Sequence, residues 1–145
     1  MRLQSKVAII TGGASGIGFA AARKFKEEGA IVIIADYNDT LANTVASNLH
    51  VDAYKLDVRN RMSCEQLVKF VLEKYGKIDV LVNNAGITKD KMLHKMTEQD
   101  FDDVLDVNCK GVFNMTQAVV PFMREAGYGK IINTASIVGV NGNVG

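Results

Sequence analysis

The chain has 145 residues and a formal net charge of +1 at pH 7, and 48% of its residues are hydrophobic. This length and composition predict a single folded domain, residues 1–145, and exclude a disordered chain. The near-zero charge gives no reason to expect binding to nucleic acid or to a membrane surface, and no apolar run approaches the roughly 20 residues that span a bilayer.

The cysteines and histidines exclude a zinc site. Cys64 and Cys109 lie far apart and form no Cys-x-x-Cys motif, and His50 and His94 are the only histidines. This set cannot supply the ligands of a tetrahedral zinc centre, so no metal is predicted. Two unmatched thiols are typical of a reduced, cytoplasmic protein.

The first 36 residues predict a strand, a glycine turn, a helix and a second strand. The apolar run Lys6–Thr11 forms the first strand, and Gly16–Glu28 shows the apolar spacing of a helix that ends at Gly29. The second strand, Ile31–Ala35, is apolar throughout and ends in Asp36. Such a run is typical of a parallel strand that is covered on both faces.

The glycines between the first strand and helix have the spacing G-x-x-x-G-x-G. Gly12 allows the sharp exit from the strand, Gly16 lets the backbone approach a pyrophosphate, and Gly18 lets helix and strand pack closely. Backbone N–H groups at the start of a helix bind phosphate. Alone, the spacing also fits a tight turn without a ligand.

Two further strands follow, separated by helices. Asn38, Asp39 or Thr40 can cap a helix over 41–49, and the strand 52–56 is closed by Asp57 and Val58. Asn60 or Ser63 can cap the next helix, which ends before Gly76. The fourth strand, 78–82, leads into the run Asn83-Asn84-Ala85-Gly86.

The last third predicts one long helix and a fifth strand. Residues 87–96 form a loop or short helix, and Thr97 with Asp100 resembles a capping box before a helix to about Arg124. Pro121 is expected to kink or shorten the last turn of that helix. The fifth strand, 129–135, ends at Ser136, and a loop is predicted from Ile137 onward.

The alternation of strands and helices predicts the α/β class. We expect a Rossmann-like, doubly wound parallel sheet of five strands in the order 3-2-1-4-5. Ligands of such sheets bind beyond the carboxyl ends of the strands. Polar and glycine residues follow each of these ends, at Gly12–Gly18, Asp36, Asp57, Asn83–Gly86 and Ser136.

Together these motifs resemble the short-chain dehydrogenase/reductase family over the whole chain. The resemblance implies an oxidoreductase that transfers hydride between NAD(P)H and a carbonyl or secondary alcohol. It implies that eleven residues bind the cofactor and that two act in catalysis. The cofactor-binding residues are Gly12, Ser15, Gly16, Ile17, Gly18, Asp36, Asp57, Val58, Asn84, Ala85 and Gly86, and the catalytic residues are Ser136 and Asn108.

The resemblance gives these residues separate roles. Asp57 and Val58 would hold the adenine, and the Asn84-Ala85-Gly86 stretch would line the nicotinamide half. Asn108 would distort its helix and hold a water of the proton relay, while Ser136 would polarise the substrate carbonyl. An ordinary turn acid, an exposed asparagine and a strand-end serine remain the alternatives for these side chains. Asn83 is expected to tie the fourth strand to its neighbours through its amide.

The cofactor is predicted to be NAD, with NADP as the alternative. Asp36 stands 18 residues after Gly18, where an acid accepts hydrogen bonds from the adenosine ribose. A carboxylate there also repels a 2′-phosphate. Ser15, Tyr37 and Asn38 occupy the places where family members that use NADP often carry a basic residue.

The family's catalytic Tyr-x-x-x-Lys pair is absent from the 145 residues. None of the four tyrosines has a lysine four positions later. The resemblance places this pair just beyond Gly145, so we expect an N-terminal fragment that lacks the C-terminal strands and helices of the fold and is inactive alone. Ile131 and Ile132 would then lie near an open sheet edge and favour self-association.

Within the family, the chain resembles the 3-oxoacyl-[acyl-carrier-protein] reductases of fatty acid biosynthesis. The resemblance rests on residues 83–90 with Leu93 and Met96, and on the pattern of Ser136, Gly139, Gly142, Asn143 and Gly145. It implies a small-molecule or carrier-bound carbonyl substrate. The full-length family commonly forms homotetramers through the helix over 98–124.

Two other functions remain open. An NAD-linked dehydrogenase of 3-hydroxyacyl groups, sugars or small alcohols fits Asp36 better than an NADPH-dependent reductase does. A cofactor-binding module without catalysis fits the absent Tyr-x-x-x-Lys pair. Lys89, Lys91 and Lys95 either attract an acidic carrier protein or form an ordinary solvated loop.

Overall fold

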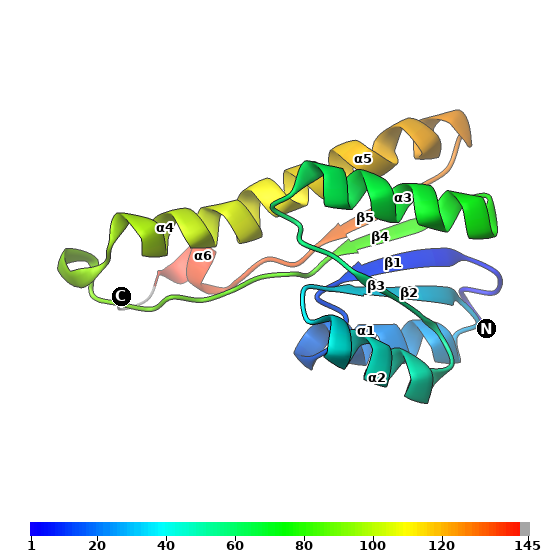
Figure 1. Cartoon of the computed structure of the whole chain (residues 1–145), viewed down its shortest axis with the longest axis horizontal. Coiled ribbons are helices and arrows are strands. Elements are labelled where there is room, and N and C mark those ends of the chain that lie inside the picture. The colour runs from blue at the N-terminus through cyan, green and yellow to red at the C-terminus, as the bar shows by residue number, and fades with distance from the viewer. Residues whose placement is uncertain (143–145) are drawn as a thin grey trace.

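The computed structural model describes residues 1–142, and its core is a parallel sheet with helices on both faces (Figure 1). Within this range the strands follow the order β3-β2-β1-β4-β5, as the sequence predicts. The strands are β1 (Val7–Thr11), β2 (Ile31–Asp36), β3 (Asp52–Lys55), β4 (Val80–Asn83) and β5 (Lys130–Asn133).

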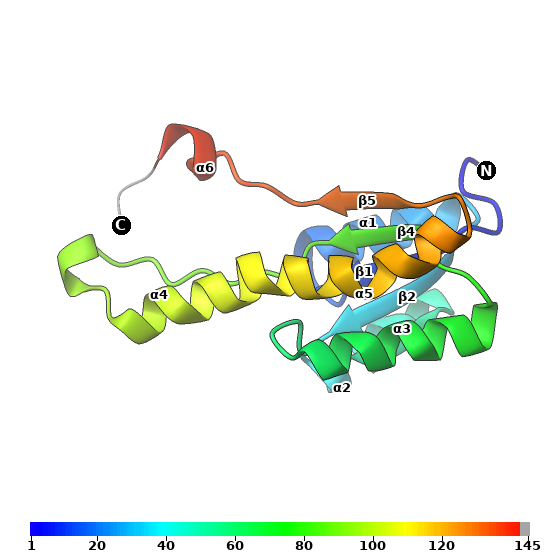
Figure 2. The same cartoon turned by 90° about the horizontal axis from the view of Figure 1, so that it is seen from above.

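The helices lie between the strands along the chain. The predicted boundaries before β5 lie within two residues of the observed ones when Asn60, rather than Ser63, is taken as the cap of the third helix. The helical elements are α1 (Gly16–Glu27), α2 (Asp39–Leu49), α3 (Arg61–Tyr75), the 3-10 turn η1 (Leu93–Lys95), α4 (Glu98–Leu105), the π-helical turn η2 (Asp106–Lys110), α5 (Gly111–Glu125) and α6 (Val138–Asn141). Helices α1 and α2 cover one face of the sheet, and α3 and α5 cover the other (Figures 1 and 2).

The core is divided into two layers by the alternation of side chains along the strands. In β1, Val7 and Ile9 pack against the α3 and α5 side, whereas Ala8 and Ile10 pack toward α1 and α2. All four side chains are fully buried. Because β1 is central and covered on both faces, its first four residues are all apolar, as expected for a parallel strand, and only the last, Thr11, is polar.

Three of the predicted helix caps are present. Asn38 accepts a hydrogen bond from Leu41 N, Asn60 accepts one from Ser63 N, and Thr97 forms a capping box with Asp100. The backbone at Gly76 is left-handed and ends α3. These caps fix where α2, α3 and α4 begin or end, and with them the loops that follow the strands.

The long helix is interrupted. A π-helical turn, η2, separates α4 from α5, where the sequence pattern predicts one continuous helix, and it contains Asn108, at which the family resemblance implies a distortion. α5 ends at Glu125, close to the predicted end at about Arg124, with Pro121 in its interior. Val119 and Met123 are buried on the two sides of the proline, so core packing retains the last turn despite the missing N–H group.

The C-terminal segment also differs from the prediction. β5 ends at Asn133, two residues early, because its partner β4 ends at the paired Asn83. Ser136 therefore lies beyond the strand, and α6 forms one helical turn where a loop was expected. Residues 143–145, including Asn143 and Gly145 of the reductase pattern, lie outside the described residues.

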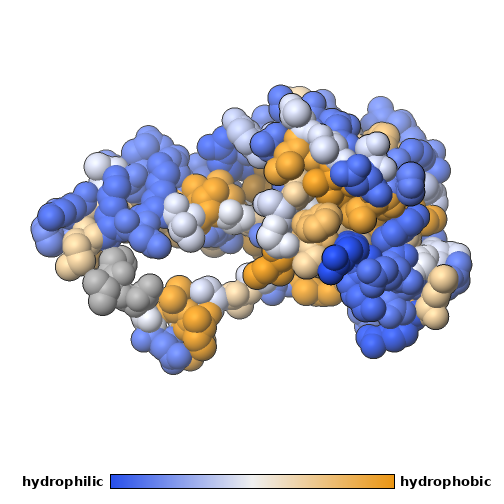
Figure 3. Space-filling model, turned by 90° about the horizontal axis from the view of Figure 1, so that it is seen from below, coloured by the Kyte–Doolittle hydropathy of each residue, from blue (hydrophilic) through white to orange (hydrophobic). Residues whose placement is uncertain are grey.

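β5 lies at the edge of the sheet in the described structure, which confirms the open edge predicted for Ile131 and Ile132. Ile132 is 46% exposed. The hydrophobic side chains of Ile137, Val138 and Val140 are also exposed, and Figure 3 shows hydrophobic surface on the α6 segment. The self-association expected from such an edge stays a prediction.

Asp79 joins β1 and β4 at the end of the sheet that lies opposite the glycine loop. The residue is 5% exposed. Its carboxylate accepts hydrogen bonds from Val7 N at 2.9 Å and from Lys6 Nζ, and it forms a salt bridge with Lys77 at 2.9 Å. Burial alone raises the pKa of Asp79, but the bonds from Val7, Lys77 and Lys6 together hold this pKa below its ordinary value.

The charge of Asp79 therefore stabilises the fold above the unfolded carboxyl pKa of about 3.9, and this contribution is lost as the pH falls through the lower folded value. We expect Asp79→Asn to lower the free energy of unfolding by about 1–3 kcal/mol at neutral pH. The difference in the free energy of unfolding between the two proteins should shrink as the pH falls toward about 3. Urea unfolding at neutral and at acid pH measures this difference, with Asp90→Asn at an exposed position as the control. A pH-independent difference would contradict the role of the charge.

Candidate functional site

The glycine loop after β1 has the backbone shape that the sequence predicts. Gly12 and Gly16 have φ angles of +61° and +53°, a region that glycine adopts without strain. A Cβ atom at Gly18 would lie 2.1 Å from Gly12 O, so only glycine allows α1 to approach the turn this closely. No atom lies within 4 Å of a Cβ built on Gly16, which leaves that side of the loop open.

The exposed residues at the start of α1 fit a bound phosphate. Ser15 is the N-cap of α1, but its hydroxyl makes no capping hydrogen bond and stays available. Ser15, Gly16 and Ile17 are all exposed. The free N–H groups of the first helical turn carry partial positive charge, which suits a pyrophosphate.

Asp36 ties the end of β2 to the glycine loop. One carboxylate oxygen accepts a hydrogen bond from Ala14 N at 3.1 Å, and the other accepts one from Asn38 N at 3.0 Å. The side chain is half-buried, and each oxygen retains accepting capacity for a ribose hydroxyl. The structure thus places Asp36 beside the loop, as the sequence predicts.

Asp57 is paired with Arg59, a residue that the sequence analysis did not single out. Arg59 donates from Nε at 3.0 Å and from Nη2 at 2.9 Å to the two carboxylate oxygens. The hydrogen-bonded guanidinium holds the pKa of Asp57 below its ordinary value. The same guanidinium lies 5.7 Å from the ring centre of Tyr37, which follows Asp36. The Arg59 guanidinium therefore lies near the ends of β2 and β3, where the Asp57 carboxylate balances its charge.

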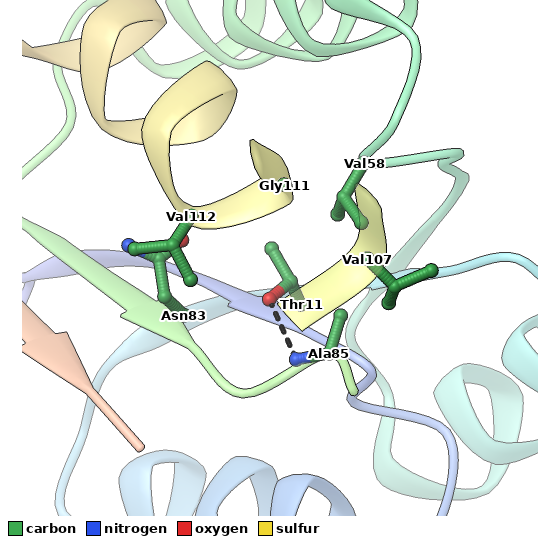
Figure 4. Close-up of a pocket in the computed structure, with 7 residues that line it drawn as sticks. All are labelled: Thr11, Val58, Asn83, Ala85, Val107, Gly111 and Val112. Carbon is green, nitrogen blue, oxygen red and sulfur yellow. Dashed lines mark hydrogen bonds between the residues drawn. The ribbon is translucent and has the colours of Figure 1, made fainter. Parts of the chain in front are cut away.

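Thr11 joins the turn after β1 to the turn after β4. Its buried hydroxyl accepts hydrogen bonds from Asn84 N and Ala85 N, both at 3.0 Å, and donates to Val82 O at 3.3 Å. Figure 4 shows the Thr11–Ala85 bond at a small pocket lined by Thr11, Val58, Asn83, Ala85, Val107, Gly111 and Val112. The Asn84 side chain adds bonds to Thr11 O at 3.1 Å and Gly12 O at 3.2 Å.

Asn83 has the structural role that the sequence predicts. Its buried amide donates to Thr116 Oγ1 on α5 at 3.1 Å and to Asn133 Oδ1 on β5 at 2.9 Å. These bonds tie β4 to β5 and to α5. Asn83 therefore holds the strand end that leads into the Asn84-Ala85-Gly86 turn.

Asn108 lies in the π-helical turn η2 and fastens the loop after β4. Its amide nitrogen donates to Ile87 O and its amide oxygen accepts from Ile87 N, both at 2.9 Å. The helix distortion that the resemblance implies at this residue is present. Gly86 lies beside the same amide, because a Cβ there would meet Asn108 Oδ1 at 3.5 Å.

Ser136 is exposed on the segment between β5 and α6, and its hydroxyl accepts a 3.3 Å hydrogen bond from Val138 N. No hydrogen bond in the described residues joins it to Asn108. The structure therefore brings together the cofactor-side residues, while the assigned role of Ser136 stays a prediction.

Lys89 and Lys91 are engaged by α4. Lys89 pairs with Asp103 and Asp100, and Lys91 pairs with Asp100. Hydrogen bonds from Lys91 and Thr97 hold the pKa of Asp100 well below its ordinary value. Of the two interpretations of these lysines, the contacts favour a structural, solvated loop.

Across residues 1–142, no helix has the length and apolar character of a membrane span. The same residues contain no cluster of three histidine, cysteine or acidic side chains that could hold a metal ion.

The glycine loop, the β2 acid and the polar strand ends define a dinucleotide-type α/β fold. A family model described as short chain dehydrogenase matches residues 6–145. The chain belongs to this family.

Several relatives are similar over almost the whole chain. The 3-oxoacyl-[acyl-carrier-protein] reductase FabG of Thermotoga maritima is 48% identical over 100% of this chain and 61% of its own. The acetoacetyl-CoA reductase of Paracoccus denitrificans is 44% identical over 93% of this chain and 56% of its own. A crystal structure of 3-ketoacyl-(acyl-carrier-protein) reductase from Brucella melitensis, complexed with NADH, has a TM-score of 0.94 at 34% identity over 98% of this chain and 62% of its own. The chain thus spans about three fifths of the length of these proteins.

Substitution of Thr11 tests whether its hydroxyl holds the turns after β1 and β4 together. Thr11→Val keeps the shape but leaves the N–H groups of Asn84 and Ala85 without their acceptor. We expect a loss of about 2–3 kcal/mol in the free energy of unfolding.

Denaturant unfolding measures the change, and Thr11→Ser, which keeps the hydroxyl, should retain most of the stability. A small loss in the valine variant together with a larger loss in the serine variant would show that the methyl group, rather than the hydrogen bonds, is responsible.

Proposed function

We propose that the chain is the cofactor-binding part of an NAD-dependent oxidoreductase that acts on 3-oxoacyl thioesters. The observation that carries the proposal is the contact of the Asp36 carboxylate with the glycine loop at Ala14 N. This contact supports the proposal because a carboxylate after the second strand can accept hydrogen bonds from ribose hydroxyls, and the start of a helix can bind phosphate. The similarity to 3-oxoacyl-[acyl-carrier-protein] reductases supports the substrate class.

The residues present fit a nicotinamide dinucleotide. Gly12, Ser15, Gly16, Ile17 and Gly18 would hold the pyrophosphate, and Asp36 would bind the adenosine ribose. Asp57 and Val58 would hold the adenine, while Asn84, Ala85 and Gly86 would line the nicotinamide half. The bound cofactor supplies the hydride, and the chain orients it at the carboxyl ends of the strands.

Two side chains of the chain are proposed to act at the reacting carbonyl. Ser136 would donate a hydrogen bond to the carbonyl oxygen, and Asn108 would hold a water of the proton relay. Asn108 already bonds Ile87 N and O, so its amide orientation is fixed by the loop after β4. The family's proton-donating tyrosine and its lysine are not among the 145 residues.

A second candidate function is a non-catalytic cofactor-binding module, which the cofactor-side residues alone would also fit. An NAD-linked dehydrogenase of 3-hydroxyacyl groups, sugars or small alcohols remains the alternative substrate class. A carrier-bound thioester gains no support from Lys89 and Lys91, because aspartates of α4 already neutralise them.

Assembly and location form part of the same proposal. Phe113 and Phe122 on α5 are 58% and 39% exposed, and Phe101 on α4 is 54% exposed, which suits the helix-mediated homotetramer of the family. Cys64 and Cys109 are unpaired thiols, in keeping with a cytoplasmic protein.

The choice of cofactor is tested by parallel titrations with NADH and NADPH. We expect NADH to bind at least about 10-fold more tightly, because the Asp36 carboxylate repels the 2′-phosphate. Asp36→Asn removes that charge and should narrow the difference. Nicotinamide fluorescence reports both affinities, with Asp39→Asn at an exposed position as the control. Tighter binding of NADPH by the unaltered chain would refute the assignment of NAD.

The catalytic competence of the 145 residues is tested with a 3-oxoacyl thioester and NADH. A missing general acid costs about 10²- to 10⁴-fold in rate, so we expect the chain to fall at least that far below the Thermotoga maritima reductase in the same assay. Oxidation of NADH at 340 nm measures turnover. A rate near that of the longer relative would show that another group donates the proton.

A further inference from the structure

Asn114 is a buried polar residue of α5 that contacts the loop after β3. It is 5% exposed, and its side-chain amide donates to Val58 O at 2.9 Å and to Arg59 O at 3.2 Å. The bonded residues are 56 and 55 positions apart in the sequence. A buried amide that bonds two successive carbonyls fixes the orientation of the peptide groups between Val58 and Asn60.

Two further contacts hold the same loop. A Cβ atom at Gly111, three residues before Asn114 on α5, would lie 2.6 Å from Val58 Cγ2, so the helix backbone already touches this side chain. Figure 4 shows Val58 beside Gly111 at the pocket. From the other side, Cys64 Sγ donates to Val58 O at 3.6 Å. The loop is thus fixed from α3 and from α5.

The fixed loop presents a main-chain donor that the protein does not use. Within the described residues, Asp57 N and Arg59 N are hydrogen-bonded, whereas Val58 N has no acceptor. Next to it, the Asp57 carboxylate retains accepting capacity beside Arg59. A donor next to an acceptor matches the edge of adenine, which offers the N1 acceptor and the 6-amino donor.

We infer that Asn114 is a positioning residue for the adenine of the cofactor, acting through the backbone of Val58 and Arg59. The inference rests on the proposed function, because it assumes that the dinucleotide binds at the carboxyl ends of the strands. Asn114 does not touch the base. It keeps the Val58 N–H group and the Asp57 carboxylate in the relative position in which they can bond adenine N1 and the 6-amino group.

The inference predicts an effect on base discrimination, which a merely structural role would not change. Hypoxanthine carries a donor at N1 and an acceptor at C6, the reverse of adenine. A preorganised Val58–Asp57 edge should therefore reject reduced nicotinamide hypoxanthine dinucleotide relative to NADH. A loop that has lost its bonds to Asn114 can rearrange and should discriminate less.

The experiment measures dissociation constants for both dinucleotides by nicotinamide fluorescence, well below the melting temperature of each variant. We expect the unaltered chain to prefer NADH by about 10-fold and Asn114→Ala to reduce this preference to about 2-fold, mainly through weaker NADH binding. Met115→Leu, a buried volume-conserving change at the next position of α5, should keep the full preference.

The outcomes separate the inference from the proposed function. If the unaltered chain does not bind NADH, the proposed function itself fails. If it binds NADH but does not prefer it, or if Asn114→Ala weakens both dinucleotides equally, only the inference fails. Should the alanine variant not fold, Asn114→Ser is judged by the same ratio of dissociation constants.

Discussion

The hydroxyl of Thr11 is the interaction on which the site depends. It accepts from the two N–H groups of Asn84 and Ala85 and donates to Val82 O, so one side chain fixes the turns after β1 and β4 together. The Asn84 amide strengthens the same junction through Gly12 O. The turn proposed to bind the pyrophosphate and the turn proposed to line the nicotinamide half of the cofactor are therefore held together by one contact between adjacent strands.

Helix α5 has a comparable role on the other side of the sheet. Asn83 bonds Thr116, Asn114 bonds the loop after β3, and Asn108 in the preceding π-helical turn bonds Ile87. These three asparagines thus connect the continuous η2–α5 segment to the ends of β3 and β4. In a regular α-helix every residue advances by about 100°, so the wider π turn resets which side chains face the sheet after Asn108.

Much of the fold and part of the site could be predicted from the sequence, because the signals are local. The caps at Asn38, Asn60 and Thr97 involve residues three positions apart, and the apolar run of β2 indicates a covered parallel strand. The pairing of Asn114 with Val58 could not be predicted in this way, because it joins residues 56 positions apart. The end of β5 lies earlier than predicted because it depends on where β4 stops. The helix distortion at Asn108 was expected from the family resemblance rather than from a local sequence pattern. Arg59 was missed for a similar reason, since its approach to Tyr37 depends on the pairing of β2 with β3.

The sheet order has a consequence for how the chain acquires its shape during synthesis. β1 is made first, and its pairing with β2 closes a short stretch of chain, whereas the Thr11 bonds to Asn84 and Ala85 span 73 and 74 positions. Closing a longer loop costs more chain entropy, so the β1–α1–β2 unit can form before the β4 contacts do. The glycine loop therefore emerges from the ribosome long before the residues that lock it, and it reaches its final form only after residue 85 is available.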